Sequence, residues 1–160
     1  PAKIVTEMNN SISDNNESNM FVTLIVGILD LETGILKLCN AGHNPPILIY
    51  PDGQVSYLEF KTQIFVGVVE DFKYSDEEVV LEKESKLFLY TDGVTEAENI
   101  NKELYGEEKL LEMLSDNASS DVRTTVNVVV DSIASHVKEA EASDDLTILL
   151  IQYEPGTANS

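Results

Sequence analysis

The fold of this chain is organised around Leu87-Phe88-Leu89-Tyr90-Thr91-Asp92-Gly93-Val94-Thr95-Glu96-Ala97, where a run of apolar and aromatic residues ends on a carboxylate followed by glycine. A buried strand that ends in aspartate holds the carboxylate in a fixed place, which suits it as a ligand for a hard cation. The glycine lets backbone or an ion come close. Asp-Gly is also the commonest signal of a type I′ hairpin turn. By themselves these residues favour the turn over the ligand, and the interpretation depends on the rest of the chain.

Composition excludes several classes of protein. The 160 residues suit one domain, and 42% of them are hydrophobic, which is enough for a core. The sequence contains no apolar run near the roughly 20 residues that cross a bilayer, and no signal peptide is visible. The formal net charge of -19 argues against nucleic acid and anionic membranes as partners. The same charge fits a basic partner, a cation or simply a soluble acidic surface.

The single cysteine, Cys39, excludes an internal disulfide. It lies in an apolar run, so we expect a small buried hydrophobic residue rather than a nucleophile. A chain without disulfides has the reducing cytoplasm as its default compartment. We therefore predict a cytoplasmic domain that does not insert into the membrane.

Apolar periodicity predicts an α+β fold, with a first helix, then antiparallel strands, then two helices and a last strand. Residues 1–18 place Ile4, Met8 and Ile12, with Val5 beside them, in one apolar stripe of a helix. Residues 20–41 are predicted to form a hairpin whose first strand, 20–29, is covered on both faces. The other predicted strands are 47–50, 54–58, 64–69, 78–81, 86–91 and 146–153. The later predicted helices are 104–115 and 122–137, with the N-cap of the second offered by Ser119-Ser120-Asp121.

Carboxylates occur at the ends of two predicted strands. Asp92 follows the strand at 86–91, and Asp144-Asp145 precedes the strand at 146–153. If these strands are antiparallel neighbours, the carboxylates converge at one edge of the sheet. Converged carboxylates repel unless a proton or a cation neutralises them, and ligands that are all oxygen favour Mg²⁺ or Mn²⁺. In a chain this acidic, aspartates also occur in loops without binding a metal. A metal site and ordinary loop acids are therefore evenly supported as interpretations of Asp92 and Asp144-Asp145.

Five short motifs occur in the order seen in one family of proteins. They are Met20-Phe21-Val22-Thr23, Asn40-Ala41-Gly42-His43-Asn44-Pro45-Pro46, Tyr90-Thr91-Asp92-Gly93-Val94-Thr95-Glu96-Ala97, Tyr105-Gly106 and Ser143-Asp144-Asp145-Leu146-Thr147. With these motifs the chain resembles the bacterial branch of the metal-dependent PPM (PP2C-like) serine/threonine phosphatases, the branch of SpoIIE and RsbU. The resemblance implies one phosphatase domain over residues 1–153 and a flexible tail over residues 154–160.

The resemblance also implies an architecture and a set of site residues. The architecture is a four-layer α/β/β/α sandwich of antiparallel sheets, with a site for two Mn²⁺ or Mg²⁺ ions at one end. Asp92 and Asp144 match the family's catalytic metal ligands, and Gly93 and Asp145 match further positions of the metal site. In such a site the ions lower the pKa of a bridging water, which attacks the phosphorus of a phosphoserine or phosphothreonine.

One departure from the family pattern concerns the N-terminal strands. The family's other bridging acid lies in a Gly-Asp-x-x-Gly-His-Gly type motif, and nothing like it occurs in this sequence. We therefore expect a sandwich that lacks the N-terminal strands and has an incomplete metal site. We also expect this chain by itself to be a weak or inactive phosphatase. Unpaired sheet edges would be a route to self-association.

Three further residues have more than one interpretation. His43 is either a general base or, more commonly for such a loop, a residue that orders the loop through its backbone. Glu96 either holds a metal-bound water or is an exposed loop acid. Both are candidates for a loop or substrate surface. His136, on the predicted helix at 122–137, is expected to be solvated.

The leading hypothesis is therefore a protein serine/threonine phosphatase of bacterial signal transduction. The resemblance implies that its partner is a phosphorylated regulatory protein of the anti-anti-sigma type, and hence a role in sigma factor regulation. The alternative is a non-catalytic PP2C-like module that binds or regulates a protein, which the missing acid favours. A plain cation-binding sandwich is a third hypothesis, against which the ordered motifs argue.

Overall fold

The computed structural model describes residues 1–14, 16–17, 19–140 and 144–155, which form three α-helices, one 3-10 helix and seven strands. The chain divides into two compact units. The first comprises residues 1–45, 59–81 and 154–160, and the second comprises residues 46–58 and 82–153. Most of the predicted tail, and Ser143 of the last motif, lie outside the described residues. Among the described helices none is long and apolar enough to span a membrane.

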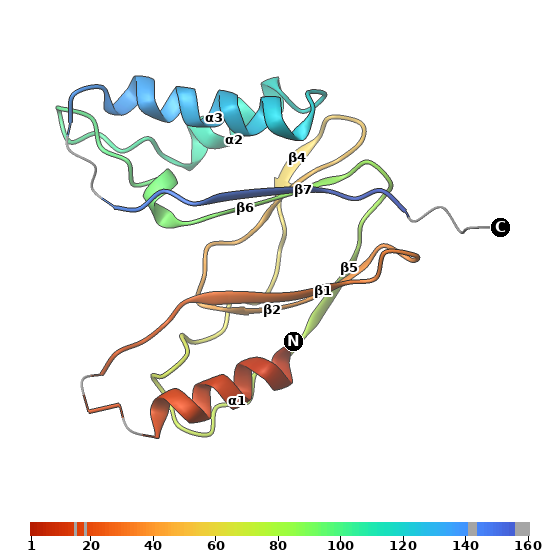
Figure 1. Cartoon of the computed structure of the whole chain (residues 1–160), viewed down its shortest axis with the longest axis vertical. Helices are drawn as coiled ribbons and strands as arrows, with labels where there is room; N and C mark the ends of the chain where they lie inside the picture. Colours follow the sequence, from red (N-terminus) through yellow and green to blue (C-terminus); the bar gives the residue numbers. More distant parts are fainter. Residues whose placement is uncertain (15, 18, 141–143, 156–160) are drawn as a thin grey trace. The chain divides into compact units, whose positions relative to one another are not determined.

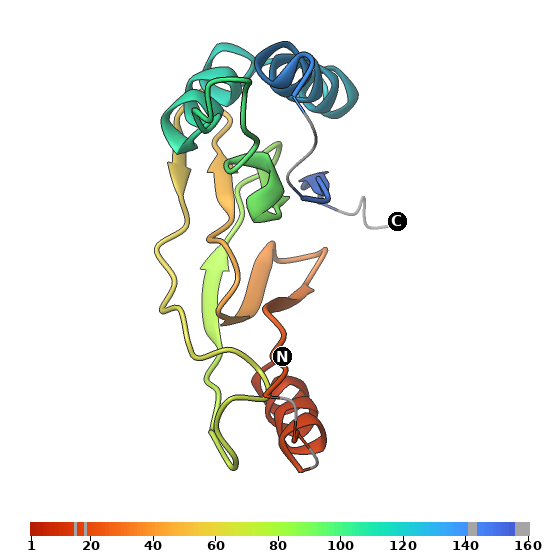
Figure 2. The ribbon, with the colours of Figure 1, turned by 90° about the vertical axis from the view of Figure 1, so that its left-hand side faces the viewer.

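The first unit is a three-stranded antiparallel sheet with one helix packed on it (Figure 2). The sheet has the order β1-β2-β5, from β1 (Leu24–Leu29), β2 (Ile35–Ala41) and β5 (Glu77–Val80). The helix is α1 (Ala2–Ser13). The core between helix and sheet consists of Ala2, Val5, Cys39, Ala41, Val66 and Tyr74. The prediction of a buried Cys39 is confirmed, and burial raises the pKa of its thiol.

Helix α1 buries only part of the predicted stripe. Ala2, Val5 and Asn9 are its buried residues, whereas the side chains of Ile4 and Met8 are 49% and 37% exposed. Residues 2, 5 and 9 share a face because they follow the three- and four-residue spacing of a helix. The predicted stripe is therefore confirmed at Val5, which is fully buried, and at Ile12, which packs against the core, and it is wrong at Ile4 and Met8.

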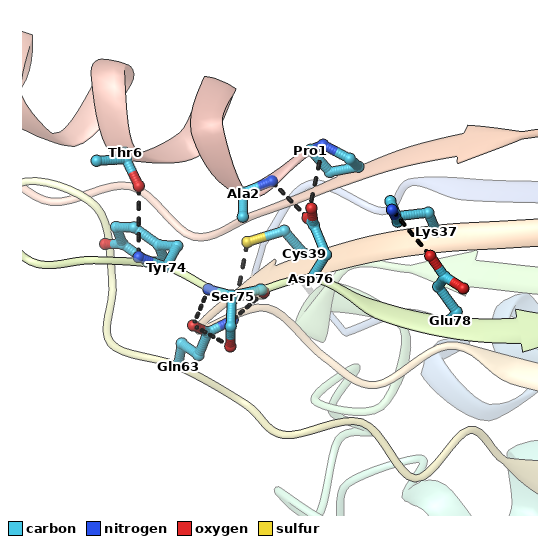
Figure 3. Close-up of polar contacts among 10 residues, drawn as sticks. All are labelled: Pro1, Ala2, Thr6, Lys37, Cys39, Gln63, Tyr74, Ser75, Asp76 and Glu78. Atoms are coloured by element: carbon cyan, nitrogen blue, oxygen red, sulfur yellow. Dashed lines mark hydrogen bonds and ion pairs between the residues drawn. The ribbon is translucent and has the colours of Figure 1, made fainter.

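Polar side chains form hydrogen bonds to the start of α1 and to the segment before β5 (Figure 3). The backbone N–H of Ala2 donates to the carboxylate of Asp76 over 2.5 Å, which places a negative charge at the positive end of the helix. The side chain of Gln63 accepts from the backbone N–H of Ser75 over 2.7 Å and donates to its carbonyl over 2.9 Å. Residues distant in sequence are therefore joined by side-chain bonds around one edge of the sheet.

The predicted strand at 64–69 is wrong. Around it the described residues form isolated bridges, Val22 with Val66 and Ala41 with Gln63, instead of a strand. The buried side chain of Asn9 accepts from the N–H of Gly67 and donates to the carbonyl of Val69, both over 2.9 Å. Buried backbone groups need partners, and here a helix side chain supplies them in place of a neighbouring strand.

Strand β1 is a half-exposed edge strand, which corrects the prediction that it is covered on both faces. It begins at Leu24 rather than at residue 20, and β2 is its hydrogen-bonded neighbour in the described sheet. The side chain of Ile28 is 55% exposed. Its apolar composition therefore does not come from burial on both faces.

The second unit is a four-stranded antiparallel sheet with two helices on one face (Figure 1). The sheet has the order β4-β3-β6-β7, from β3 (Ile47–Ile49), β4 (Val55–Tyr57), β6 (Lys86–Tyr90) and β7 (Ile148–Gln152). Helices α2 (Glu107–Asp116) and α3 (Val122–Val137) pack against each other and against β4 and β7 respectively. The core between helices and sheet includes Ile47, Ile49, Phe88, Tyr90, Leu110, Leu114, Val129, Ile133 and Leu150.

The ends of these two helices follow local signals. The bounds of α3 agree with the prediction, and the carboxylate of Asp121 accepts from the N–H of Thr124 as its N-cap. Helix α2 begins later than predicted, at Glu107, because Gly106 before it has a φ of 82°. The predicted solvation of His136 is confirmed only in part. Its ring is half-buried, with Nε2 lying 2.9 Å from the carbonyl oxygen of Glu103.

Lys86, the first residue of β6, joins the sheet to the connection between α2 and α3. Its side chain is buried, and Nζ donates to the carbonyl oxygens of Ala118 over 2.7 Å and Ser120 over 2.5 Å. Burial lowers the pKa of this ammonium group. The hydrogen-bond partners of this buried amino group are therefore carbonyl oxygens.

We expect Lys86→Met to lower the free energy of unfolding at pH 7 by about 2 kcal/mol, because the two carbonyls lose their donor. The unfolded chain binds more protons than the folded one between the lowered pKa of Lys86 and its ordinary value of 10.5, so this residue stabilises more as the pH rises through that window. Urea unfolding at several pH values checks both statements, with exposed Lys3→Met as the control. A wild-type advantage over Lys86→Met that shrinks with rising pH would contradict the second.

Candidate metal centre

Two neighbouring strands bring the predicted aspartates to one end of the second unit's sheet. β6 and β7 are antiparallel, with Tyr90 opposite Ile148. Asp92 follows the end of β6, and Asp144 and Asp145 precede the start of β7 (Figure 1). The hypothesis that these strands are antiparallel neighbours is confirmed, and the three aspartates therefore lie at the same end of the sheet.

Asp92-Gly93 is not a hairpin turn. Residues Asp92–Val94 form a 3-10 helix, η1, and neither Asp92 nor Gly93 has the positive φ that a type I′ turn requires. The carbonyl of Asp92 accepts from the N–H of Glu96 over 2.8 Å. Its carboxylate accepts from the N–H of Gly93 over 3.0 Å, which helps to orient it. The chain thus turns away from β6 instead of pairing back on it.

Gly93 permits a close approach between two segments of backbone. A Cβ at this position would lie 2.4 Å from the carbonyl oxygen of Asp145 and 3.6 Å from Cβ of Asp144. The expectation that this glycine lets backbone come close is confirmed. Gly93 is therefore needed because it has no side chain, and not because of a left-handed conformation. The segment that carries the other two aspartates occupies the space where a side chain would lie.

The three aspartates place negative charge at one end of the second unit's sheet. Their side chains are exposed, and none takes part in the ion pairs found among the described residues. The carboxylate of Asp144 accepts from the N–H of Asp145 over 2.7 Å, as that of Asp92 does from Gly93. Like charges at one place repel, so protons or a cation at this end of the sheet would relieve the repulsion.

The donors at this end of the sheet are of the kind that a hard cation takes. They are all oxygen, as Mg²⁺ and Mn²⁺ prefer, and Mg²⁺ usually keeps several waters and takes one or two carboxylates from the protein. Across the part of the chain that the structure describes, no three acidic, histidine or cysteine side chains are grouped so that they could hold a metal ion. Asp92 and Asp144 are the candidate ligands, beside Gly93 and Asp145, and their metal binding stays a prediction.

The candidate surface residues His43 and Glu96 belong to different units. His43 lies in the first, where the side chain of Asn40 donates to its carbonyl over 2.9 Å and accepts from its N–H over 2.8 Å. Its ring Nδ1 lies 3.3 Å from the hydroxyl of Thr23. The loop is thus ordered through the backbone of His43, with Asn40 as the partner. Glu96 is exposed just after η1. Their roles toward a substrate stay predictions.

Two features of the site were missed from the sequence. The chain after η1 doubles back on itself, because the N–H groups of Tyr105 and Gly106 donate to the carbonyls of Ala97 and Thr95 over 2.8 and 2.9 Å. Thr91, next to Asp92, bonds through its hydroxyl to the segment before β7. Tyr105-Gly106 and Thr91 both belong to the five motifs, but no local pattern in these motifs reveals such bonds.

The sequence matches the family described as Stage II sporulation protein E (SpoIIE) over residues 1–154, and the chain belongs to this family. It is 24% identical over 153 residues to the phosphoserine phosphatase RsbU of Bacillus subtilis (strain 168), an alignment that covers 95% of this chain and 45% of RsbU. The curated relatives are longer proteins, of which the alignments cover between 22% and 45%.

Solved structures show the same fold at low sequence identity. The SiaA-PP2C domain of Pseudomonas aeruginosa superposes with a TM-score of 0.82 at 21% identity, over 96% of this chain and 61% of that one. RsbX, in a crystal structure in complex with magnesium, superposes with a TM-score of 0.64 at 19% identity, over 94% of this chain and 63% of that one. The chain therefore has a PP2C-like α+β fold with two antiparallel sheets.

Proposed function

We propose that this chain is a metal-dependent phosphoserine/phosphothreonine phosphatase domain of bacterial signalling. The observation that carries the proposal is the pairing of β6 with β7, which brings Asp92 and Asp144 to one end of a sheet. Membership of the SpoIIE family and the likeness to the phosphoserine phosphatase RsbU support the class of reaction.

The chemistry of the proposal rests on charge. Mn²⁺ or Mg²⁺, when bound, would lower the pKa of a coordinated water and neutralise the phosphoryl oxygens. Asp92 and Asp144 would be the protein ligands, with the backbone at Gly93 and the carboxylate of Asp145 beside them. Exposed carboxylates without a cation repel a phosphate dianion. We therefore expect binding of the phosphorylated substrate, and not turnover alone, to require the metal.

The proposed partner is a phosphorylated regulatory protein of the anti-anti-sigma type in the cytoplasm. The likeness to the phosphoserine phosphatase RsbU supports a substrate that carries phosphoserine. The formal net charge of -19 supports a partner with a basic surface and argues against nucleic acid as a partner. The layers of the domain are proposed to be α/β/β/α. The likeness of the fold to that of the SiaA-PP2C domain supports this.

The test is hydrolysis of p-nitrophenyl phosphate and of a phosphoserine protein by the full-length protein and by the 160-residue chain, with Mn²⁺, Mg²⁺ or EDTA. We expect metal-dependent turnover that falls by at least about 100-fold in Asp92→Asn and in Asp144→Asn, because each removes a metal-binding oxygen. Asp131→Asn, which changes an exposed aspartate on α3, is the matched control and should behave as wild type. The 160-residue chain alone is expected to be weakly active, because among its described residues no three acidic, histidine or cysteine side chains are grouped so that they could hold the metal.

Two outcomes would overturn the proposal. Turnover that persists in EDTA, or that survives Asp92→Asn unchanged, would remove the metal mechanism. A folded full-length protein that binds the phosphoprotein but hydrolyses nothing at any metal concentration would favour the non-catalytic binding module.

A further inference from the structure

Thr91 connects the two segments that carry the aspartates. Its hydroxyl donates to the carbonyl oxygen of Asp145 over 3.2 Å and accepts from the N–H of Thr147 over 3.1 Å. Its own backbone N–H donates to the carbonyl of Thr147 over 3.1 Å. The residue before Asp92 thus makes three bonds to the three-residue stretch after Asp144, and two of them use the side chain.

The same carbonyl of Asp145 is held from two sides. The Thr91 hydroxyl donates to it, and the space at Gly93 admits it to within 2.4 Å of an ideal Cβ position. The bond to Thr91 holds the carbonyl near the start of η1. Gly93 permits this position because it lacks the Cβ that would clash with the carbonyl. These two contacts flank Asp92, so they fix the distance between its backbone and that of Asp144 and Asp145.

We infer that Thr91 is a positioning residue of the metal site: its hydroxyl holds the segment of Asp144 and Asp145 against that of Asp92. The inference rests on the proposed function, and it adds a residue that binds neither metal nor substrate. Carboxylates bind a divalent cation well when their positions are fixed before the ion arrives. Without the hydroxyl, β6 and β7 still pair, but the segment before β7 loses its side-chain anchor.

The chemistry requires a hydroxyl and not merely a side chain of this size. A hydroxyl donates one hydrogen bond while accepting another, which is the combination found at Thr91. Thr91→Val keeps the shape and the β-branch and removes both bonds. Thr91→Ser keeps the hydroxyl and removes a methyl group. The two variants therefore separate hydrogen bonding from packing.

The test measures Mn²⁺ binding to the full-length protein by titration calorimetry, with no substrate present. Residues that orient metal ligands typically contribute 10- to 100-fold to metal affinity, so we expect Thr91→Val to weaken Mn²⁺ binding by about tenfold or more. Thr91→Ser should stay within about threefold of wild type because it keeps the hydroxyl. Exposed Thr62→Val is the control for a threonine hydroxyl elsewhere. Amide hydrogen exchange should show a faster Thr147 N–H in Thr91→Val alone.

The outcomes separate this inference from the proposed function. If wild type binds no Mn²⁺, the metal-dependent function fails, and the role of Thr91 in the metal site fails with it. If wild type binds Mn²⁺ and Thr91→Val binds it equally well, the positioning role is overturned while the phosphatase stands. Equal losses in Thr91→Ser and Thr91→Val would also overturn it, because the hydroxyl would not be the cause. Circular dichroism and urea unfolding establish that the variants are folded.

Discussion

Gly93→Ala is expected to lower metal-dependent phosphatase turnover by about 100-fold in a protein that remains folded. The new Cβ would lie 2.4 Å from the carbonyl oxygen of Asp145 and 3.1 Å from its carbonyl carbon. Both obstacles are backbone atoms, which cannot rotate away as the end of a side chain can. The segment of Asp144 and Asp145 must therefore move relative to Asp92. A displacement of about 1 Å in a catalytic site is enough for a loss of this size.

The measurement is kcat on p-nitrophenyl phosphate across a range of Mn²⁺ concentrations. Gly27→Ala in β1 is a matched control, because its Cβ would lie 2.8 Å from Cδ2 of Leu38, the movable end of a side chain in the first unit. It should keep nearly all of the turnover. Undiminished turnover in Gly93→Ala at every Mn²⁺ concentration would show that the close approach has no part in the site.

Asn9→Ala is expected to lower the free energy of unfolding by about 3 kcal/mol, the largest effect on stability that we predict. Asn9 is 0% exposed, and its side chain is the partner of the Gly67 N–H and the Val69 carbonyl. Alanine removes that partner and leaves the N–H of Gly67, a buried residue, without its acceptor. Such an orphaned group costs roughly 1 to 3 kcal/mol. Urea denaturation followed by circular dichroism measures the loss.

The neighbouring residue supplies the control. Asn10 is half-buried, and its side-chain oxygen has no hydrogen-bond partner among the described residues. Asn10→Ala removes a buried oxygen without a bond, so we expect it to change stability little or to raise it. If the two adjacent substitutions destabilise equally, the cost at Asn9 does not come from its hydrogen bonds.

Elements with a clear period were predicted correctly from the sequence. Helix α3 has the predicted bounds because its valines repeat at the spacing of one helical face, and Asp121 supplies the N-cap. Strands β2, β3 and β6 lie within the predicted runs. Period alone does not decide burial on α1, since Ile4 and Met8 have the spacing of one helical face and are still exposed.

The candidate site was predicted in part. The pairing of β6 with β7 followed from the two strand ends, and it is confirmed. The local signal of Asp92-Gly93 favoured a hairpin turn, which is wrong, because the glycine makes room for a contact with Asp145 in the segment before β7. The Thr91 hydroxyl was overlooked for the same reason. Its partners are 54 and 56 residues away, and no local pattern encodes them.

The sequence by itself determined most of the periodic elements, the α+β class, the order of the motifs and the aspartates proposed as metal ligands. These depend on residues within a few positions of one another, whose spacing sets a helical or extended period. Tertiary structure decided which face of α1 is buried, why residues 64–69 need no strand, and how closely the Asp145 carbonyl meets Gly93. Each of these depends on bonds or contacts between distant segments, such as Asn9 with Gly67, 58 residues apart, which exist only once the chain has packed.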